Sequence, residues 1–216
     1  MKKRYLRMNL FYIPALLLIL FFVLGPLAEA FRISFTQWNG YSQDYKYVGF
    51  KNYLKLFTDS NFLTSFRNTI IYGFGSTLLQ NLLGLAYAVF LNSKFKGHEI
   101  VRTFIYMPVM ISSLIMGYII YFFVQYNHGI FNEITGLFGM APIDWMASGN
   151  RGVIIITLMN SWQYVGIAMV IYMAGLQNIP AMYLEAAEID GATSWQRFRH
   201  ITFPLLLPSI SSAVVL

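Results

Sequence analysis

The chain of 216 residues contains no cysteine and very little charge. Without cysteine it can form neither a disulfide nor a thiolate metal site. Charged side chains make up 11% of the residues, whereas soluble domains average about 25%. Hydrophobic residues make up 57% of the chain, and this excess of apolar over charged side chains predicts a membrane protein.

The sequence also lacks the motifs of nucleotide and metal chemistry. It contains no Gly-x-x-x-x-Gly-Lys-Ser/Thr phosphate-binding loop. Its histidines (His98, His128 and His200) fall in three separate loops and share no ligand spacing with a carboxylate. Glu185 and Glu188 are three residues apart, but no partner residues accompany them as an acid/base pair would require. We therefore expect no catalytic residue, no metal and no cofactor in this chain, and any ATP and Mg²⁺ on a separate subunit.

The net charge of +6 does not indicate nucleic-acid binding. No stripe of Lys and Arg interleaved with aromatic residues occurs, and the basic residues are spread over the segments between apolar runs. In a membrane protein such residues act as topology signals, because cytoplasmic loops are enriched in Lys and Arg. We expect no nucleic-acid partner and a lipid membrane around the chain.

Charge-free runs divide the chain into membrane spans. Crossing a bilayer takes about 20 apolar residues. The first run covers residues 10–27, and three more predict complete spans over residues 68–92, 103–127 and 152–176. From Pro204 onward the remaining run is too short to cross, which predicts the start of a fifth span in a longer protein. The fold class expected is an all-α polytopic helical bundle.

The basic residues orient these spans. Lys2, Lys3, Arg4 and Arg7 precede the first run, so the N-terminus is expected in the cytoplasm and the first run as an uncleaved span. Residues 93–102 then form a cytoplasmic loop, and residues 31–67 and 128–151 form outer segments. The chain is accordingly divided into a cytoplasmic N-terminus with its first helix (1–30), an extracytoplasmic segment (31–67) and a transmembrane domain (68–216).

The outer segment contains a turn at residues 38–40 and a short amphipathic stretch. Its apolar residues recur at helical spacing with Lys51 and Lys55 off that face: Phe50, Tyr53, Leu54 and Phe57. Such a pattern is typical of a short helix on the membrane surface. It also fits a contact surface for a soluble partner, and periodicity does not distinguish the two.

A charged insert separates the last two apolar runs. Pro180 suits the first position of a helix that Gly191 can end in a left-handed conformation. Thr193 or Ser194 can cap a second helix, whose apolar face would carry Trp195, Phe198 and Ile201. Pro204 predicts a break before the next run. The insert is either an interfacial linker or a docking element whose small residues, Ala186 and Ala187, let another protein approach closely.

The spacing of this insert resembles the signature loop of bacterial ABC importer permeases. Glu185-Ala186-Ala187 is followed after three residues by Gly191, after nine more by Ile201, and then by Phe203 (where leucine is usual) and Pro204. Stretches at 34–40, 48–53, 68–69, 102–108 and 174–180 resemble the carbohydrate-uptake subgroup of these permeases, of the maltose and multiple-sugar type.

The resemblance implies the type I ABC importer permease fold in the bacterial inner membrane. It implies that loop 178–203 is cytoplasmic, that its first helix fits a groove on an ATPase dimer, and that Glu185 pairs with a basic residue there. The implied coupling residues are Glu185, Ala186, Ala187, Asp190, Gly191, Ala192, Phe198, Ile201 and Pro204. The further partners implied are a second homologous permease and an extracytoplasmic sugar-binding protein. The chain itself would form the pathway for a sugar or oligosaccharide and would not be an enzyme.

Polar residues inside the predicted spans are candidates for this pathway: Asn160, Trp162, Gln163 and Tyr164 in the fourth span, and Gln80 and Asn81 in the second. Such residues usually face a bundle interior or a cavity. Amides can bind sugar hydroxyls and an aromatic ring can stack on a sugar. The same residues could instead form hydrogen bonds between helices.

Three other functions are alternatives to sugar transport for this chain. A permease for a glycerol phosphate shares the fold and loop, but phosphate favours Arg or Lys along the pathway, and spans two to four contain none. A membrane scaffold would not need the spaced signature. A membrane-embedded enzyme would need a charged or nucleophilic cluster, which the sequence does not show.

Overall fold

The structure is a computed structural model that describes residues 12–42, 45–93 and 95–215. The basic residues at positions 2–7 that predict the orientation of the N-terminus lie outside the described residues. The chain divides into two units, Met1–Phe66 and Arg67–Leu216.

The first unit begins with one long helix. It comprises α2 (Tyr12–Ile19), a π-helical turn (Leu20–Leu24) and α3 (Gly25–Ser34). Together they form a helix of 23 residues that is long and apolar enough to cross a membrane. The helix continues past the predicted run, and its last turns contain an ion pair of Arg32 with Glu29 at 2.6 Å. Because the two residues are one turn apart on one helix face, each compensates the charge of the other near the end of the span.

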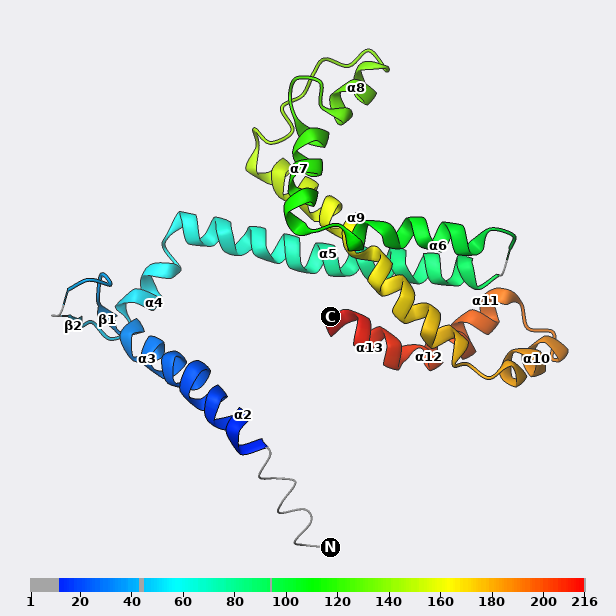
Figure 1. Cartoon of the computed structure of the whole chain (residues 1–216), viewed down its shortest axis with the longest axis horizontal. Coiled ribbons are helices and arrows are strands. Elements are labelled where there is room, and N and C mark those ends of the chain that lie inside the picture. The colour runs from blue at the N-terminus through cyan, green and yellow to red at the C-terminus, as the bar shows by residue number, and fades with distance from the viewer. Residues whose placement is uncertain (1–11, 43–44, 94, 216) are drawn as a thin grey trace, which may run out of the picture. The chain divides into compact units, whose positions relative to one another are not determined.

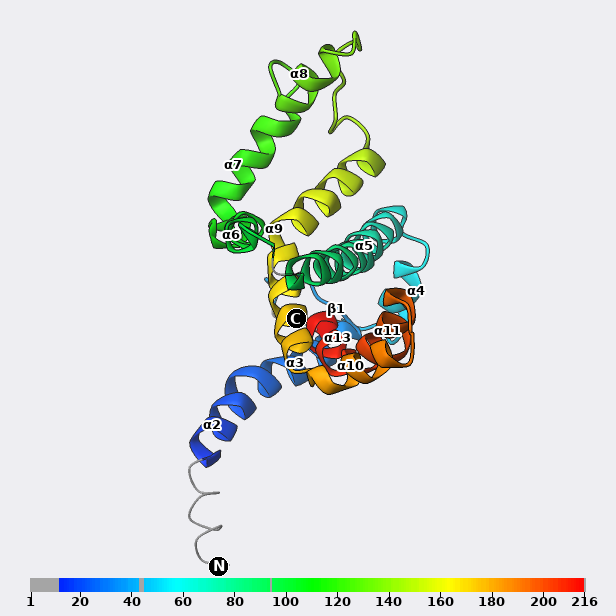
Figure 2. The ribbon, with the colours of Figure 1, turned by 90° about the vertical axis from the view of Figure 1, so that its right-hand side faces the viewer.

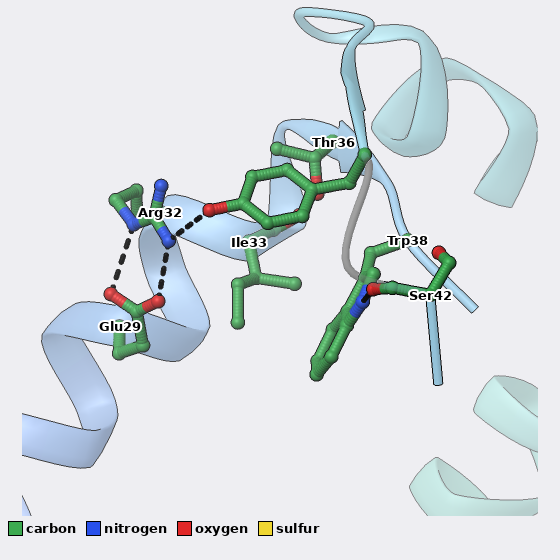
Figure 3. A network of polar contacts seen from close by, with 7 residues as sticks. Glu29, Arg32, Ile33, Thr36, Trp38 and Ser42 are labelled. Carbon is green, nitrogen blue, oxygen red and sulfur yellow. Dashed lines mark hydrogen bonds and ion pairs between the residues drawn. The ribbon is translucent and has the colours of Figure 1, made fainter. Parts of the chain in front are cut away.

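A small hairpin and a short helix follow the span. The antiparallel strands β1 (Thr36–Gln37) and β2 (Lys46–Tyr47) pair, and α4 (Lys51–Leu56) comes next. The predicted turn is confirmed, since Gly40 has a φ of +88° and the Asn39 carboxamide oxygen accepts from the backbone N–H groups of residues 41 and 42. The hairpin is joined to the span by a hydrogen bond that the Arg32 guanidinium donates to the Tyr45 hydroxyl at 2.7 Å. Figure 3 shows Arg32 beside its ion-pair partner Glu29.

The second unit is a set of helices that cross one another (Figures 1 and 2). The long helix α5 (Ser60–Asn92) starts in the first unit and continues into the second. The elements after it are α6 (His98–Tyr106), a 3₁₀ turn (Met107–Met110), α7 (Ser113–Val124), α8 (Ile130–Gly136), α9 (Gly149–Gln177), α10 (Ala181–Ile189), α11 (Ser194–Arg197), a π-helical turn (Phe198–Thr202), α12 (Phe203–Leu205) and α13 (Leu207–Val215). Three helices of the described residues can cross a membrane, or up to five if each of two bent pairs counts as one span.

The third predicted span is not straight. The sequence predicts a continuous span over residues 103–127, but the helical segments 98–110 and 113–124 meet at 101°. Pro108 lies in the 3₁₀ turn, where its missing N–H ends the regular hydrogen-bond ladder. Ile111 is then extended, with ψ of 131°, and the Ser112 hydroxyl caps α7 by accepting from the backbone N–H of Ile115.

Helix α9 is the centre of the second unit. Its buried side chains Ala168, Met169, Tyr172 and Met173 form a core with residues of α5 and with Leu206. Gly84 of α5 touches this core so closely that an added Cβ would lie 2.7 Å from the Ala168 Cβ. Gly75 of α5 also faces α9, since its Cβ position lies 3.0 Å from the Thr157 Cγ2 atom, whereas Gly73 has nothing within 4 Å at the Cβ position.

Asn132 organises the connection between α7 and α9. Its side-chain N–H₂ donates to the backbone carbonyls of Tyr126 and Ile143, at 3.0 and 2.9 Å. Its carbonyl oxygen accepts from the Ile143 backbone N–H at 3.0 Å and from the Trp145 indole at 2.9 Å. With its side chain buried and each donor and acceptor engaged, Asn132 fixes this connection as a compact lobe. Figures 1 and 2 place its helix, α8, at the opposite end of α9 from α10 and α11.

Candidate functional site

The signature loop folds as a helix, a turn and a second helix. Helix α10 ends at Ile189, and Gly191, two residues further on, has a φ of +77°, the left-handed conformation predicted for it. The backbone N–H groups of Gly191 and Ala192 donate to the carbonyls of Glu188 and Ala187, at 3.1 and 2.9 Å. Pro180 lies one position earlier than predicted, because it is the residue before the helix, with ψ of 129°, rather than the first helical residue.

The second helix begins at a capping box. Thr193 accepts a hydrogen bond from the Gln196 backbone N–H at 3.3 Å, and the Gln196 side-chain oxygen accepts one from the Thr193 backbone N–H at 2.8 Å. Of the two residues predicted as caps, the structure therefore selects Thr193. This reciprocal pair fixes the point at which the chain enters the second helix.

An ion pair connects the two helices of the loop. The Arg197 guanidinium lies 2.8 Å from the Glu188 carboxylate and also donates to the Ser194 hydroxyl at 3.3 Å. The Arg197 side chain is 25% exposed, whereas that of Glu188 is 72% exposed. The less exposed Arg197 thus holds the carboxylate of Glu188 in place. Because the two residues belong to different helices, the ion pair restrains the angle between α10 and α11.

The predicted break at Pro204 is displaced. The chain remains helical through Pro204 and Leu205, and the bend of 61° falls between residues 205 and 207. The Phe203 N–H still bonds the Phe198 carbonyl in the π-helical turn, so the missing N–H of Pro204 falls in the first turn of α12, where its cost is small. The predicted position of the break was wrong, because the bend falls at Leu206, two residues after the proline.

The loop exposes several large apolar side chains among its polar ones. Exposed side chains include Met182 and Tyr183 on the first turn of α10, Ile189 at its end (87% exposed) and Trp195 on α11 (66% exposed). Glu185, Ala186 and Asp190 are exposed on the same short segment, and Ala187, Phe198 and Ile201 are half-buried. Trp195 stacks on Phe198 with ring centroids 5.7 Å apart. Exposed apolar side chains on both helices of the loop are a feature expected of an interaction site.

A second candidate site is a cavity of about 340 Å³ in the second unit. Its walls come from three helices: Ser76, Thr77, Gln80 and Asn81 from α5, Asn160, Tyr164, Ile167 and Ala168 from α9, and Ala213 and Val214 from α13. Four of the six predicted pathway residues therefore meet around one cavity. None of the lining residues is charged.

The hydrogen bonds divide these residues into two kinds. The Gln80 amide donates to the Asn160 side-chain oxygen at 3.1 Å. Asn81 is engaged at both ends, because its amide donates to the Thr77 carbonyl at 2.8 Å and its oxygen accepts from the Tyr172 hydroxyl at 2.5 Å. Among the described residues, no partner is found for the Asn160 amide, the Gln80 oxygen or the Tyr164 hydroxyl. These three groups are available to a ligand.

Trp162 and Gln163 lie outside the cavity. Gln163 is buried and donates to the Ile111 carbonyl at 3.5 Å, at the bend between the 3₁₀ turn and α7. Trp162 is 44% exposed. On a helix of 3.6 residues per turn, residues 160, 164, 167 and 168 share one face, so 162 and 163 point elsewhere. Helical spacing would also have found Ser76 and Thr77, four residues before Gln80 and Asn81.

The sequence of residues 80–216 matches the family described as "Binding-protein-dependent transport system inner membrane component". This match covers the signature loop and most of the cavity lining. The chain belongs to this family. It is therefore a transport permease of the inner membrane and not a catalytic subunit.

Curated relatives of the permease are similar over nearly its whole length. The "Probable starch degradation products transport system permease protein AmyD" of Thermoanaerobacterium thermosulfurigenes is 34% identical over 94% of this chain and 68% of its own. The "Trehalose/maltose transport system permease protein MalF" of Thermococcus litoralis is 31% identical over 96% of this chain and 70% of its own. These relatives confirm the predicted resemblance to permeases of the carbohydrate-uptake type.

A solved structure has the same fold. The crystal structure of a bacterial ABC transporter involved in the import of the acidic polysaccharide alginate superimposes with a TM-score of 0.82 and 25% identity, covering 99% of the permease and 72% of the matched chain. The predicted all-α ABC importer permease fold is thereby confirmed at the level of its architecture.

Proposed function

We propose that the permease forms the translocation pathway for an uncharged sugar or oligosaccharide in an ATP-driven importer. The observation that carries this proposal is the cavity between α5, α9 and α13, which is lined by amide, hydroxyl and apolar groups without charge. Relatives named for starch degradation products, trehalose and maltose, and arabinooligosaccharides support the substrate class.

The available groups suit sugar hydroxyls, each of which both donates and accepts a hydrogen bond. The Asn160 amide can donate, the Gln80 oxygen can accept, and the Tyr164 hydroxyl can do either. The hydrogen bond between Gln80 and Asn160 orients both amides toward the cavity. Each good hydrogen bond to a neutral hydroxyl contributes about 1 kcal/mol, which permits binding without trapping the substrate.

The lack of charge in the cavity separates this substrate class from two others. An acidic polysaccharide such as the alginate imported by the structural relative, or a glycerol phosphate, carries negative charge that favours Arg or Lys as a partner. None of the ten residues lining the described cavity is Arg, Lys or His. We therefore infer a preference for neutral sugars.

We further propose that loop 178–203 couples the pathway to a separate ATPase dimer, which binds ATP and Mg²⁺. The exposed apolar side chains around Glu185, Ala186 and Ala187 and the fixed angle between α10 and α11 support a docking role. The coupling set comprises Glu185, Ala186, Ala187, Asp190, Gly191, Ala192, Phe198, Ile201 and Pro204. A second homologous permease and an extracytoplasmic sugar-binding protein complete the assembly.

In this proposal the N-terminus and the coupling loop lie on the cytoplasmic side. The first span ends at Ser34, four residues beyond the predicted boundary at residue 30, so residues 35–67 lie outside and the transmembrane domain begins at residue 68. The two bent helix pairs, 98–124 and 194–215, then count as the third span and as the entry to the fifth.

The test is uptake by the native importer reconstituted in vesicles. Asn160→Leu removes the available amide and the partner of Gln80, so uptake of a labelled maltooligosaccharide should fall about fivefold or more. Trp162→Leu, on the same helix but outside the cavity, serves as the control and should leave uptake within twofold of the native value. Equal uptake by the native and Asn160→Leu importers would exclude the cavity as the pathway. Faster uptake of glycerol phosphate or oligo-alginate than of the neutral sugar would refute the substrate class alone.

A further inference from the structure

Helix α4 and its flanking residues form an amphipathic element in the first unit. Phe50, Leu54 and Phe57 follow one another at helical spacing and are 69%, 68% and 71% exposed. Lys51 and Lys55 are exposed on the adjoining face, one turn apart. An apolar stripe with lysines beside it is the pattern of a helix that lies in a membrane interface.

Hydrogen bonds attach this helix directly to the end of the first span. The Asn52 amide donates to the backbone carbonyls of Ser34 and Thr36, both at 2.8 Å. The hydroxyls of Ser34 and Tyr53 lie 2.6 Å apart. Ser34 is the last residue of α3, with which the span ends. The position of α4 is therefore set by the point at which the span leaves the membrane.

An aromatic cluster stiffens the same attachment. The Phe35 ring, immediately after the span, contacts Phe31, Phe50 and Tyr53 with ring centroids 5.1, 5.3 and 5.5 Å apart. Ring pairs at such distances stabilise a structure by more than the burial of their apolar area alone provides. Asn52 and Tyr53 attach one side of α4 to the span. The residues that take no part in this attachment are Lys51, Leu54, Lys55 and Phe57.

The chain gives α4 a second membrane anchor. Helix α4 ends at Leu56, and α5, which crosses the membrane by length and composition, begins at Ser60. The helix thus lies between two spans, hydrogen-bonded to the first and three residues from the second. A segment held at both ends in this way stays close to the bilayer surface.

We propose that α4 binds the outer leaflet of the membrane, with Leu54 and Phe57 in the acyl-chain region and Lys51 and Lys55 on the headgroups of anionic phospholipids. Lysine stems can cover apolar surface while the ammonium groups reach the phosphates. Each lysine near an anionic surface strengthens association by about fivefold. The lipid occupant follows from the attachment to the span, which a docking site for a soluble protein does not require.

The absence of cysteine makes a site-specific test possible. Leu54→Cys and Phe57→Cys variants of the full chain, purified with the subunits that accompany it, are labelled with a fluorophore and reconstituted in vesicles. Phospholipids with brominated acyl chains should quench both probes strongly. Tyr41→Cys in the hairpin, where Tyr41 is 94% exposed, is the matched control and should be quenched weakly.

The same probe measures headgroup selectivity. For the label at residue 54, brominated phosphatidylglycerol should be preferred over brominated phosphatidylcholine by about fivefold or more. Lys51→Gln with Lys55→Gln should abolish that preference, whereas Lys96→Gln, in the loop expected on the other side of the membrane, should not change it.

Two results would overturn the proposal. If water-soluble iodide quenches residues 54 and 57 as well as it quenches residue 41, while brominated lipids do not, the helix lies in water. If neither quencher reaches them, protein covers the stripe and the soluble-partner alternative is correct. If the double lysine substitution leaves the preference for phosphatidylglycerol unchanged, the lysines do not bind anionic headgroups, and that part of the proposal is wrong.

Discussion

The Tyr172 hydroxyl donates a hydrogen bond to the Asn81 side-chain oxygen, at 2.5 Å. Tyr172 is 1% exposed, in the core between α5 and α9, whereas Asn81 lines the cavity. The buried residue therefore positions a residue of the cavity wall. Because the Asn81 amide is bound to the Thr77 carbonyl as well, this wall is fixed from both ends.

Tyr172→Phe tests this positioning role. The substitution leaves the ring in the core but removes the donor to Asn81, and hydrogen bonds between membrane helices contribute about 0.6 kcal/mol and at most about 1.7 kcal/mol. We expect a small loss of thermal stability for the purified permease and a larger change in sugar selectivity, measured as the ratio of uptake rates for two neutral oligosaccharides. Tyr164→Phe is the comparison, since it removes a hydroxyl without a partner among the described residues and should not change stability. A Tyr172→Phe permease with native selectivity would show that the bond is structural only.

Gly84→Ala should destabilise the second unit. The added Cβ would lie 2.7 Å from the Ala168 Cβ and 2.9 Å from the Met169 backbone nitrogen, so α5 and α9 must separate. Overpacking of this kind typically costs about 1–3 kcal/mol. Gly73→Ala on the same helix is the control, because its Cβ meets open space and alanine favours helices. Thermal unfolding in detergent should place Gly84→Ala below and Gly73→Ala at or above the native protein, and the reverse order would contradict the close crossing.

The ion pair of Glu188 and Arg197 should affect coupling more than stability. Exposed pairs contribute at most about 1 kcal/mol, too little to unfold the loop. Arg197→Glu should nevertheless lower the amount of sugar imported per ATP hydrolysed, because like charges then meet between α10 and α11. The swapped variant, Glu188→Arg with Arg197→Glu, should recover most of the native ratio. Failure of the swap to improve on the single variant would mean that Arg197 acts through another partner.

Glu185→Lys should uncouple transport while leaving the bundle folded. Glu185 is exposed on α10, and its side chain forms no hydrogen bond or ion pair with the described residues. Reversing its charge should therefore act on the partner ATPase, and we expect weaker co-purification of the ATPase and little uptake. Glu99→Lys, also exposed and in the other predicted cytoplasmic loop, provides the control. Native uptake by Glu185→Lys would refute the docking role assigned to this residue.

The local features of the loop could be predicted because they depend on near neighbours in sequence. The left-handed Gly191, the cap at Thr193 and the polar positions 80, 81, 160 and 164 all follow from propensity and helical spacing. The 101° bend could not be predicted from the sequence. The charge-free run 103–127 continues unchanged through Pro108, and apolar composition alone does not indicate whether a helix is straight or bent. The separate positions of Gln163 and Asn160 could not be predicted either, since composition does not say which face of α9 meets α5 and which meets the bend.

Helix α9 runs without interruption from the lobe organised by Asn132 to the coupling loop. At 1.5 Å per residue its 29 residues span about 43 Å. If such a helix moves as a rigid rod, a tilt of about 5° displaces one end relative to the other by about 4 Å. Because Asn132 stabilises the connection between α7 and α9, we expect that displacement to be passed on to α7. A mechanical step at the loop can thus reach the far end of the permease through geometry alone.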